Sequence, residues 1–232
     1  MFERYPNTIS GGRAVAITRD EVVRTALRLL DDVGLEGLTL RRLGGELGVS
    51  AATLYWHVRD KRTLLDLVAE AIVAEHHPPP RPAPDQPWWE WLADGAWAQY
   101  RALVGHRDAA LVVAGNRPTE SALPGIEQAI ASLVEIGFPP REALESMLTI
   151  GHFVLGSALE YQAEAARGAA TESDAALAVR LRDAQDLPNL VAAARPGSAR
   201  DLDSTFRHGL ALIVAGLRAR HAELTGTPAA RA

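Results

Sequence analysis

The sequence predicts an all-α protein with a small N-terminal head of short helices and a larger helical body. Apolar residues recur three or four positions apart over most of the 232-residue chain, as on the buried face of a helix. Residues that favour helix starts and helix ends stand at the borders of these segments. We find no stretch with the apolar–polar alternation of a half-buried strand, so a sheet is not expected.

Composition excludes several classes of site. The chain has no cysteine, which rules out disulfides and any metal centre with thiolate ligands. No run approaches the ~18 apolar residues of a membrane span, and the first residues lack the apolar core of a signal peptide. We therefore expect a cytoplasmic protein with no membrane partner, no cofactor and no bound metal.

The first helix has a clear start and a clear end. Residues 1–16 show no periodicity and are expected to form a flexible arm. Thr18 and Glu21 have the three-residue spacing of a capping box, in which each side chain binds the other's backbone N–H. Gly34 stands where a helix would end on a residue with positive φ.

Three shorter helices follow. Thr39 can cap a second helix, Gly48 can form the turn after it, and Ser50 can cap a third helix over 51–58. Asp60 can cap a fourth, from Lys61 to about Glu75. A helix, a glycine turn and a second short helix form a helix-turn-helix. The expected head is thus 17–63, with the fourth helix continuing as a linker to about 77.

A proline-rich stretch, "HHPPPRPAPDQP", separates the head from a body over 78–232. We expect the stretch 167–200 to be a loose excursion holding one short helix. The apolar periodicity predicts body helices at 87–104, 107–115, 122–136, 140–166, 173–184 and 202–223.

The head has the features of a DNA-binding unit, although its charge balance is only +1 over residues 1–66 and the net charge of the chain is −5. The second helix of a helix-turn-helix enters the major groove. Basic, hydroxyl and aromatic groups at or near that helix can contact bases and phosphates; here they are Arg41, Ser50, Thr53, Tyr55, Trp56, His57 and Lys61. The alternative is that Tyr55 and Trp56 are core residues of a small helical bundle.

From Thr18 to about Glu75 the chain resembles the DNA-binding head of the TetR family of transcriptional repressors, most closely in "LTLRRLGGELGVSAATLYWHVRDKRTLLD". The body segments "RDAALVVAGNRP", "IGFPPREAL" and "GHFVLGSALEYQ" resemble the tetracycline-responsive members of that family. The resemblance implies a repressor that binds a palindromic DNA operator as a homodimer. It implies that Arg41 reads a base and that Ala51 and Ala52 influence which operator is chosen.

The resemblance also implies that helices near 140–166 and 202–223 form the dimer interface. Both carry much apolar surface, and four glycines would allow backbones to approach closely: Gly151, Gly156, Gly209 and Gly216. The alternative is that these helices pack only within one chain.

The same resemblance implies a site for a small-molecule effector. Its residues would be His77, Gln99, Val113, Asn116, Arg117, His152 and Glu160. Val113 stands where the tetracycline-responsive members have a magnesium-ligating histidine, and valine offers no ligand to this ion. We therefore expect an effector that binds without metal, such as an aromatic or polyketide-like antibiotic.

Three other functions are weighed. One is a tetracycline-responsive repressor with an altered pocket, and another is a DNA-binding protein without an effector. The third is an enzyme or zinc protein that uses His76, His77, His152 and Glu160. It is disfavoured because the chain lacks a nucleophile motif, a glycine-rich phosphate loop and the i, i+4 histidine pair of a metalloprotease.

Overall fold

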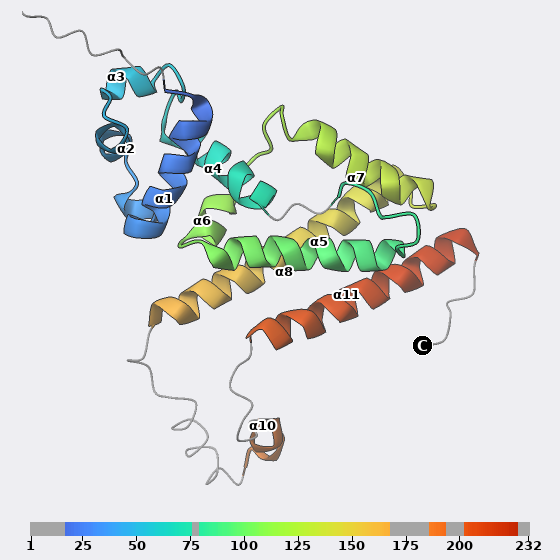
Figure 1. The fold of residues 1–232 in the computed structure, drawn as a ribbon. Coiled ribbons are helices and arrows are strands. Elements are labelled where there is room, and N and C mark those ends of the chain that lie inside the picture. Colours follow the sequence, from blue (N-terminus) through green and yellow to red (C-terminus); the bar gives the residue numbers. More distant parts are fainter. Residues whose placement is uncertain (1–16, 76–78, 168–185, 194–201, 227–232) are drawn as a thin grey trace, which may run out of the picture.

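The computed structural model describes residues 17–75, 79–167, 186–193 and 202–226, and within them every regular element is a helix (Figure 1). The predicted all-α class is thus confirmed. The expected arm at 1–16 and the expected helix at 173–184 lie outside the described residues.

The head consists of α1 (Arg19–Gly37), α2 (Leu40–Glu46), α3 (Ala51–Leu54) and the start of α4 (Lys61–Glu75). The capping box forms as predicted, with Glu21 N donating to Thr18 Oγ1 at 3.2 Å and Thr18 N donating to Glu21 Oε2 at 2.8 Å. The core of the head is made of fully buried side chains from all four helices, among them Val22, Leu30, Leu43, Leu54 and Leu64.

Two boundaries differ from the sequence prediction. Gly34 has a φ of +73° as expected, but α1 resumes after it and runs on to Gly37. The third helix ends at Leu54 rather than at 58, because the chain tightens into turns. Trp56 N donates to Thr53 O and His57 N donates to Leu54 O, three residues back in each case.

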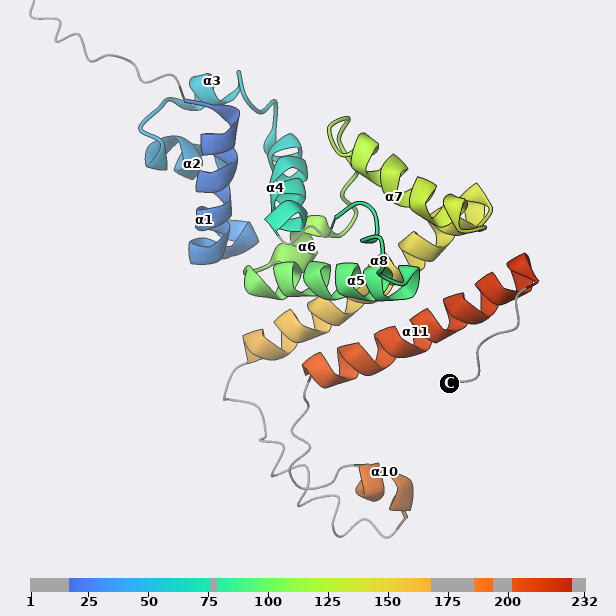
Figure 2. The same cartoon turned by 45° about the vertical axis from the view of Figure 1, so that its right-hand side comes forward.

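The body contains α5 (Trp88–Gly105), α6 (Ala109–Val113), α7 (Leu123–Glu135), α8 (Pro140–Arg167), α10 (Pro188–Ala193) and α11 (Leu202–Thr225). These bounds lie close to the predicted ones, apart from α10, which falls in the stretch expected to be loose. α5 packs across α8, and α8 and α11 run side by side in both views (Figures 1 and 2).

An aromatic cluster joins α5, α8 and α11. The ring of Phe206 stacks on Tyr100 with centroids 4.1 Å apart and on Phe153 with centroids 5.2 Å apart. Gly209, one turn further along α11, allows this packing, because a Cβ there would lie 2.6 Å from Phe153 Cζ. This glycine therefore serves close approach within one chain.

None of the described helices combines the length and the apolar character needed to cross a membrane.

Candidate functional site

The front of the helix-turn-helix exposes large aromatic side chains. Leu54 and Val58 are buried in the head, and this turns the intervening residues outward. Trp56 is 89% exposed and Tyr55 is 57% exposed. The alternative in which these two residues are core packing is therefore wrong. Exposed aromatics of this size mark an interaction surface.

Small hydroxyl groups organise the start of α3. Ser50 Oγ accepts a hydrogen bond from Thr53 N at 3.2 Å and lies 3.0 Å from Thr53 Oγ1, so Ser50 caps the helix as predicted. Ala52 is exposed beside them, whereas His57 is half-buried. The predicted DNA-contact residues from Ser50 to His57 thus lie together, in α3 and in the turns that follow it. For Ala51 only the position of the backbone is described.

The two basic side chains predicted to contact DNA, Arg41 and Lys61, have different surroundings. Arg41 is exposed on α2. Lys61 Nζ instead donates to Leu35 O at 3.0 Å, so its ammonium group ties α4 to the end of α1. Residues 50–58, which contain α3 and the turns after it, are called the recognition segment below. Sequence reasoning overlooked Arg59, whose side chain is 88% exposed between this segment and α4.

A cavity of about 730 Å³ lies in the body, between α4, α5, α7, α8 and the 114–122 connection. Its walls are largely apolar, with Trp91, Ile126 and Met147 among the larger side chains. Polar groups come from Glu70, Gln99, Asn116 and Ser121. A mostly apolar cavity with a few polar groups is the usual form of a site for a small organic molecule.

The predicted effector residues divide into three groups. Gln99, Val113 and Asn116 line the cavity, while Arg117 is exposed next to it and does not. His152 and Glu160 point out of α8 into solvent and do not line it. His77 lies outside the described residues.

Glu70 lines the cavity but was not predicted. It accepts a hydrogen bond from Thr119 N at 2.7 Å and another from Ser121 Oγ at 3.3 Å, which joins α4 to the 114–122 connection. Its position in the apolar run of α4, between Ala69 and Ala71, was the available signal.

The head meets the body around the turn between α5 and α6. His106 Nε2 lies 2.8 Å from Glu75 Oε2 on α4, and its Nδ1 lies 3.0 Å from Asp31 Oδ2 on α1. Asp108, whose φ is +56°, accepts a hydrogen bond from Leu35 N at 2.8 Å. The side chain of His106 is only 17% exposed, so most of the ring lies within this contact.

A glutamine of α8 holds the same turn from the other side. Gln162 Nε2 donates to the carbonyl oxygens of Leu103 and His106, each at 2.8 Å. Its Oε1 accepts from Ala110 N at 3.3 Å. The turn that binds the head is therefore anchored on a long helix of the body.

The carboxylates around His106 favour its charged form. Burial of the ring opposes protonation, but the hydrogen bonds and negative charges of Glu75 and Asp31 outweigh it and raise the pKa of His106. We therefore expect this head–body contact to weaken as His106 loses its proton.

The zinc hypothesis gains no support from the described part of the chain. No three His, Asp or Glu side chains gather there in a way that could hold a metal ion, and His152 and Glu160 form no pair.

Two family models match this chain, over different ranges of residues. Residues 22–68 match the family described as bacterial regulatory proteins, tetR family, and residues 81–221 match the tetracyclin repressor-like C-terminal domain. The class C tetracycline repressor protein of Escherichia coli is 38% identical over 207 residues, which are 87% of this chain and 90% of that protein.

Two solved structures are similar over the whole fold. One is a TetR variant of Acinetobacter baumannii in complex with minocycline, with a TM-score of 0.71, 32% identity and coverage of 88% of this chain and 98% of that one. The other is ActR of Streptomyces coelicolor in complex with actinorhodin, with a TM-score of 0.76, 33% identity and coverage of 87% and 95%. With its exposed recognition segment, its body cavity and these matches, the chain belongs to the TetR family of bacterial regulatory proteins.

Proposed function

We propose that this protein is a ligand-responsive transcriptional repressor that acts in the cytoplasm, binds a palindromic operator as a homodimer and is released by a small organic effector. One observation carries the proposal: α4 begins directly after the recognition segment, and its residues Ala69, Glu70 and Val73 line the cavity. Any molecule that fills the cavity therefore contacts the helix that carries the head.

Coupling between the two sites requires that the effector binds one conformation of the body better than the other. A shift of α4 would be passed to α1 through Lys61, which donates to Leu35 O, and through His106, which bridges Glu75 and Asp31. A coupling free energy of about 3 kcal/mol would weaken operator binding roughly 150-fold.

The outer face of α8 and α11 supports a homodimer. On α11 it presents small and apolar residues to solvent, namely Ala211, Leu212, Ala215, Gly216 and Ala219. Leu212 is 63% exposed, and Gly216 leaves open space above its backbone. On α8 this face continues with His152, Gly156 and Glu160, so these residues would lie at or near the interface.

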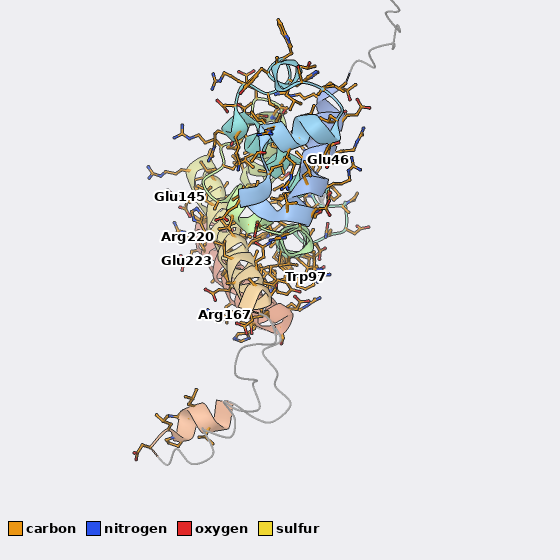
Figure 3. All side chains as sticks on the ribbon, turned by 90° about the vertical axis from the view of Figure 1, so that its left-hand side faces the viewer. Glu46, Trp97, Glu145, Arg167, Arg220 and Glu223 are labelled. Carbon is orange, nitrogen blue, oxygen red and sulfur yellow. The ribbon has the colours of Figure 1, made fainter. Side chains whose placement is uncertain are left out.

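Ion pairs flank this face. Arg220 on α11 bonds Glu142 of α8 at 2.7 Å and Glu223 at 3.1 Å, and Figure 3 shows Arg220, Glu223 and Glu145 along one edge of the body. A symmetric dimer on such a face would place two recognition segments for half-sites about one DNA turn apart.

The dimer has a direct test. Leu212→Glu places a charge in the proposed interface, and it should turn the dimer into a monomer in light scattering coupled to gel filtration. Leu111→Glu on α6 is the matched control, because Leu111 is also exposed, at 52%, but lies off this face. A dimeric L212E protein would contradict the proposed interface.

The effector is proposed to be a mid-sized aromatic molecule, such as a polyketide-like antibiotic, that binds without metal. Val113 lines the cavity and offers no ligand to magnesium. The similar structures are complexes with minocycline in one case and with actinorhodin in the other. A tetracycline-responsive repressor with an altered pocket remains the second candidate, favoured by the 38% identity to a tetracycline repressor.

The deciding experiment is a mobility-shift titration against the intergenic DNA beside the gene for this protein. It is repeated with tetracycline plus magnesium and with a panel of aromatic polyketides. Release by a polyketide alone supports the proposal, and release by magnesium–tetracycline supports the second candidate. A specific complex that no compound releases would indicate an effector-independent DNA-binding protein, and the absence of any specific complex would contradict DNA-binding altogether.

A further inference from the structure

The charge in the cavity is negative. Among the described residues that line it, Glu70 is the one ionisable side chain, and no arginine, lysine or histidine of the described part faces it. Glu70 is half-buried, so water screens its charge less than it screens a charge on the open surface.

Two polar side chains of the cavity have hydrogen-bond acceptors that are not fully used. Glu70 uses two acceptor positions on Thr119 N and Ser121 Oγ, and a carboxylate has about four such positions. Asn116 Oδ1 is buried and has no hydrogen-bond partner within the described residues. About two acceptor positions of Glu70 are therefore free for a ligand that brings N–H groups, whereas the buried Asn116 Oδ1 offers a ligand almost no surface.

Ligand charge decides how this cavity can be filled. A neutral apolar ligand that covers Glu70 removes water from a carboxylate without replacing it, which costs free energy. An anionic ligand adds repulsion between like charges. A protonated amine supplies both the opposite charge and the N–H donors that the free acceptor positions require.

We propose that the effector is an amine-bearing aromatic molecule whose ammonium group pairs with Glu70 while its ring system fills the apolar part of the cavity. This proposal rests on the proposed function and specifies the ligand class of the same site. It also assigns Glu70 a part in the response. The residue lies on α4, so an amine that pairs with its free acceptor positions binds the helix that carries the head.

The test uses three fluorescent ligands with one ring system and different charges: pyrenemethylamine, pyrenemethanol and pyreneacetate. Each is titrated into the unmodified protein and into two variants. Glu70→Gln removes the charge in the cavity but keeps an oxygen that can accept from Thr119 N. Glu127→Gln is the control, because Glu127 is an exposed side chain of α7. Circular dichroism checks that all three proteins are folded.

We expect the amine to bind about 10-fold or more tighter than the alcohol, a preference of roughly 1.4 kcal/mol, and the acid to bind weakest. The preference for the amine should disappear in E70Q and persist in E127Q. An amine that binds no tighter than the alcohol, a preference that survives in E70Q, or no binding of any of the three would overturn the proposal.

Operator binding is measured on the same samples by fluorescence anisotropy of labelled DNA. Failure of the unmodified protein to bind the operator in the absence of any ligand would contradict the proposed function itself. Intact operator binding without the charge preference would contradict only the assignment of Glu70, so the two failures are distinguishable.

Discussion

Removing the titrating side chain at the junction of head and body should make the protein less stable in acid but not in base. His106 bridges Glu75 on α4 and Asp31 on α1 at 2.8 and 3.0 Å. His106→Gln keeps a polar side chain with an N–H donor but never carries a charge. The comparison between the two proteins therefore isolates the effect of protonation.

The structure sets the size of the effect. A hydrogen bond to a charged group contributes about 1.5–3 kcal/mol in favourable surroundings. The carboxylates of Glu75 and Asp31 are 38% and 40% exposed, however, and exposed ion pairs contribute only about 0–1 kcal/mol. We expect about 1–2 kcal/mol for the two contacts together, or roughly 2–8 °C in Tm for a chain of this size.

The direction follows from the raised pKa of His106. Because protonation is favoured in the folded protein, the stabilisation is fully present below the unfolded pKa of about 6.5 and is lost as pH rises through the folded pKa. Urea unfolding followed by circular dichroism at about pH 5.5 and about pH 9 measures it. An equal difference between the two proteins at both pH values would refute the role of His106.

Three further outcomes are expected. Trp56→Ala should leave Tm unchanged, since the side chain is 89% exposed, yet should weaken operator binding by about 10-fold or more in anisotropy titrations; unchanged affinity would contradict the assigned contact surface. Phe206→Ala should cost about 3–5 kcal/mol in urea unfolding, because it opens a cavity between Tyr100 and Phe153; a loss below about 1 kcal/mol would show that the cluster repacks. Chelation of divalent metal with EDTA should leave effector-induced release from the operator unchanged, because Val113 lines the cavity and cannot bind a metal ion; a loss of release would show that metal accompanies the effector.

Local sequence was enough to define most of the helices. The capping box at Thr18 and Glu21 acts within one turn of the chain, so its effect can be recognised from spacing alone. The positive φ of Gly34 was also predictable, but the continuation of α1 to Gly37 was not. The recognition segment was also predictable, because buried Leu54 and Val58 leave only one side of it free. The length of the third helix was not predictable, because the same residues can form either i, i+3 or i, i+4 hydrogen bonds.

The sites that depend on distant residues were harder to predict. Val113, Gln99 and Asn116 were placed in the effector site by resemblance, and they do line one cavity. His152 and Glu160 were also placed there by resemblance, but both side chains face solvent. The helical periodicity could not have shown this, because it indicates which residues of a helix share a face and not which neighbour covers that face.

The sequence by itself determined the helical class, the order of head and body and the surface of the recognition segment, because these follow from interactions between residues close along the chain. Only the tertiary structure decided that Glu70 faces the cavity beside Thr119 and Ser121, and that His106 joins α1 to α4. These contacts span between 31 and 75 residues of sequence, and the packing of whole helices, not any local pattern, brings their partners together.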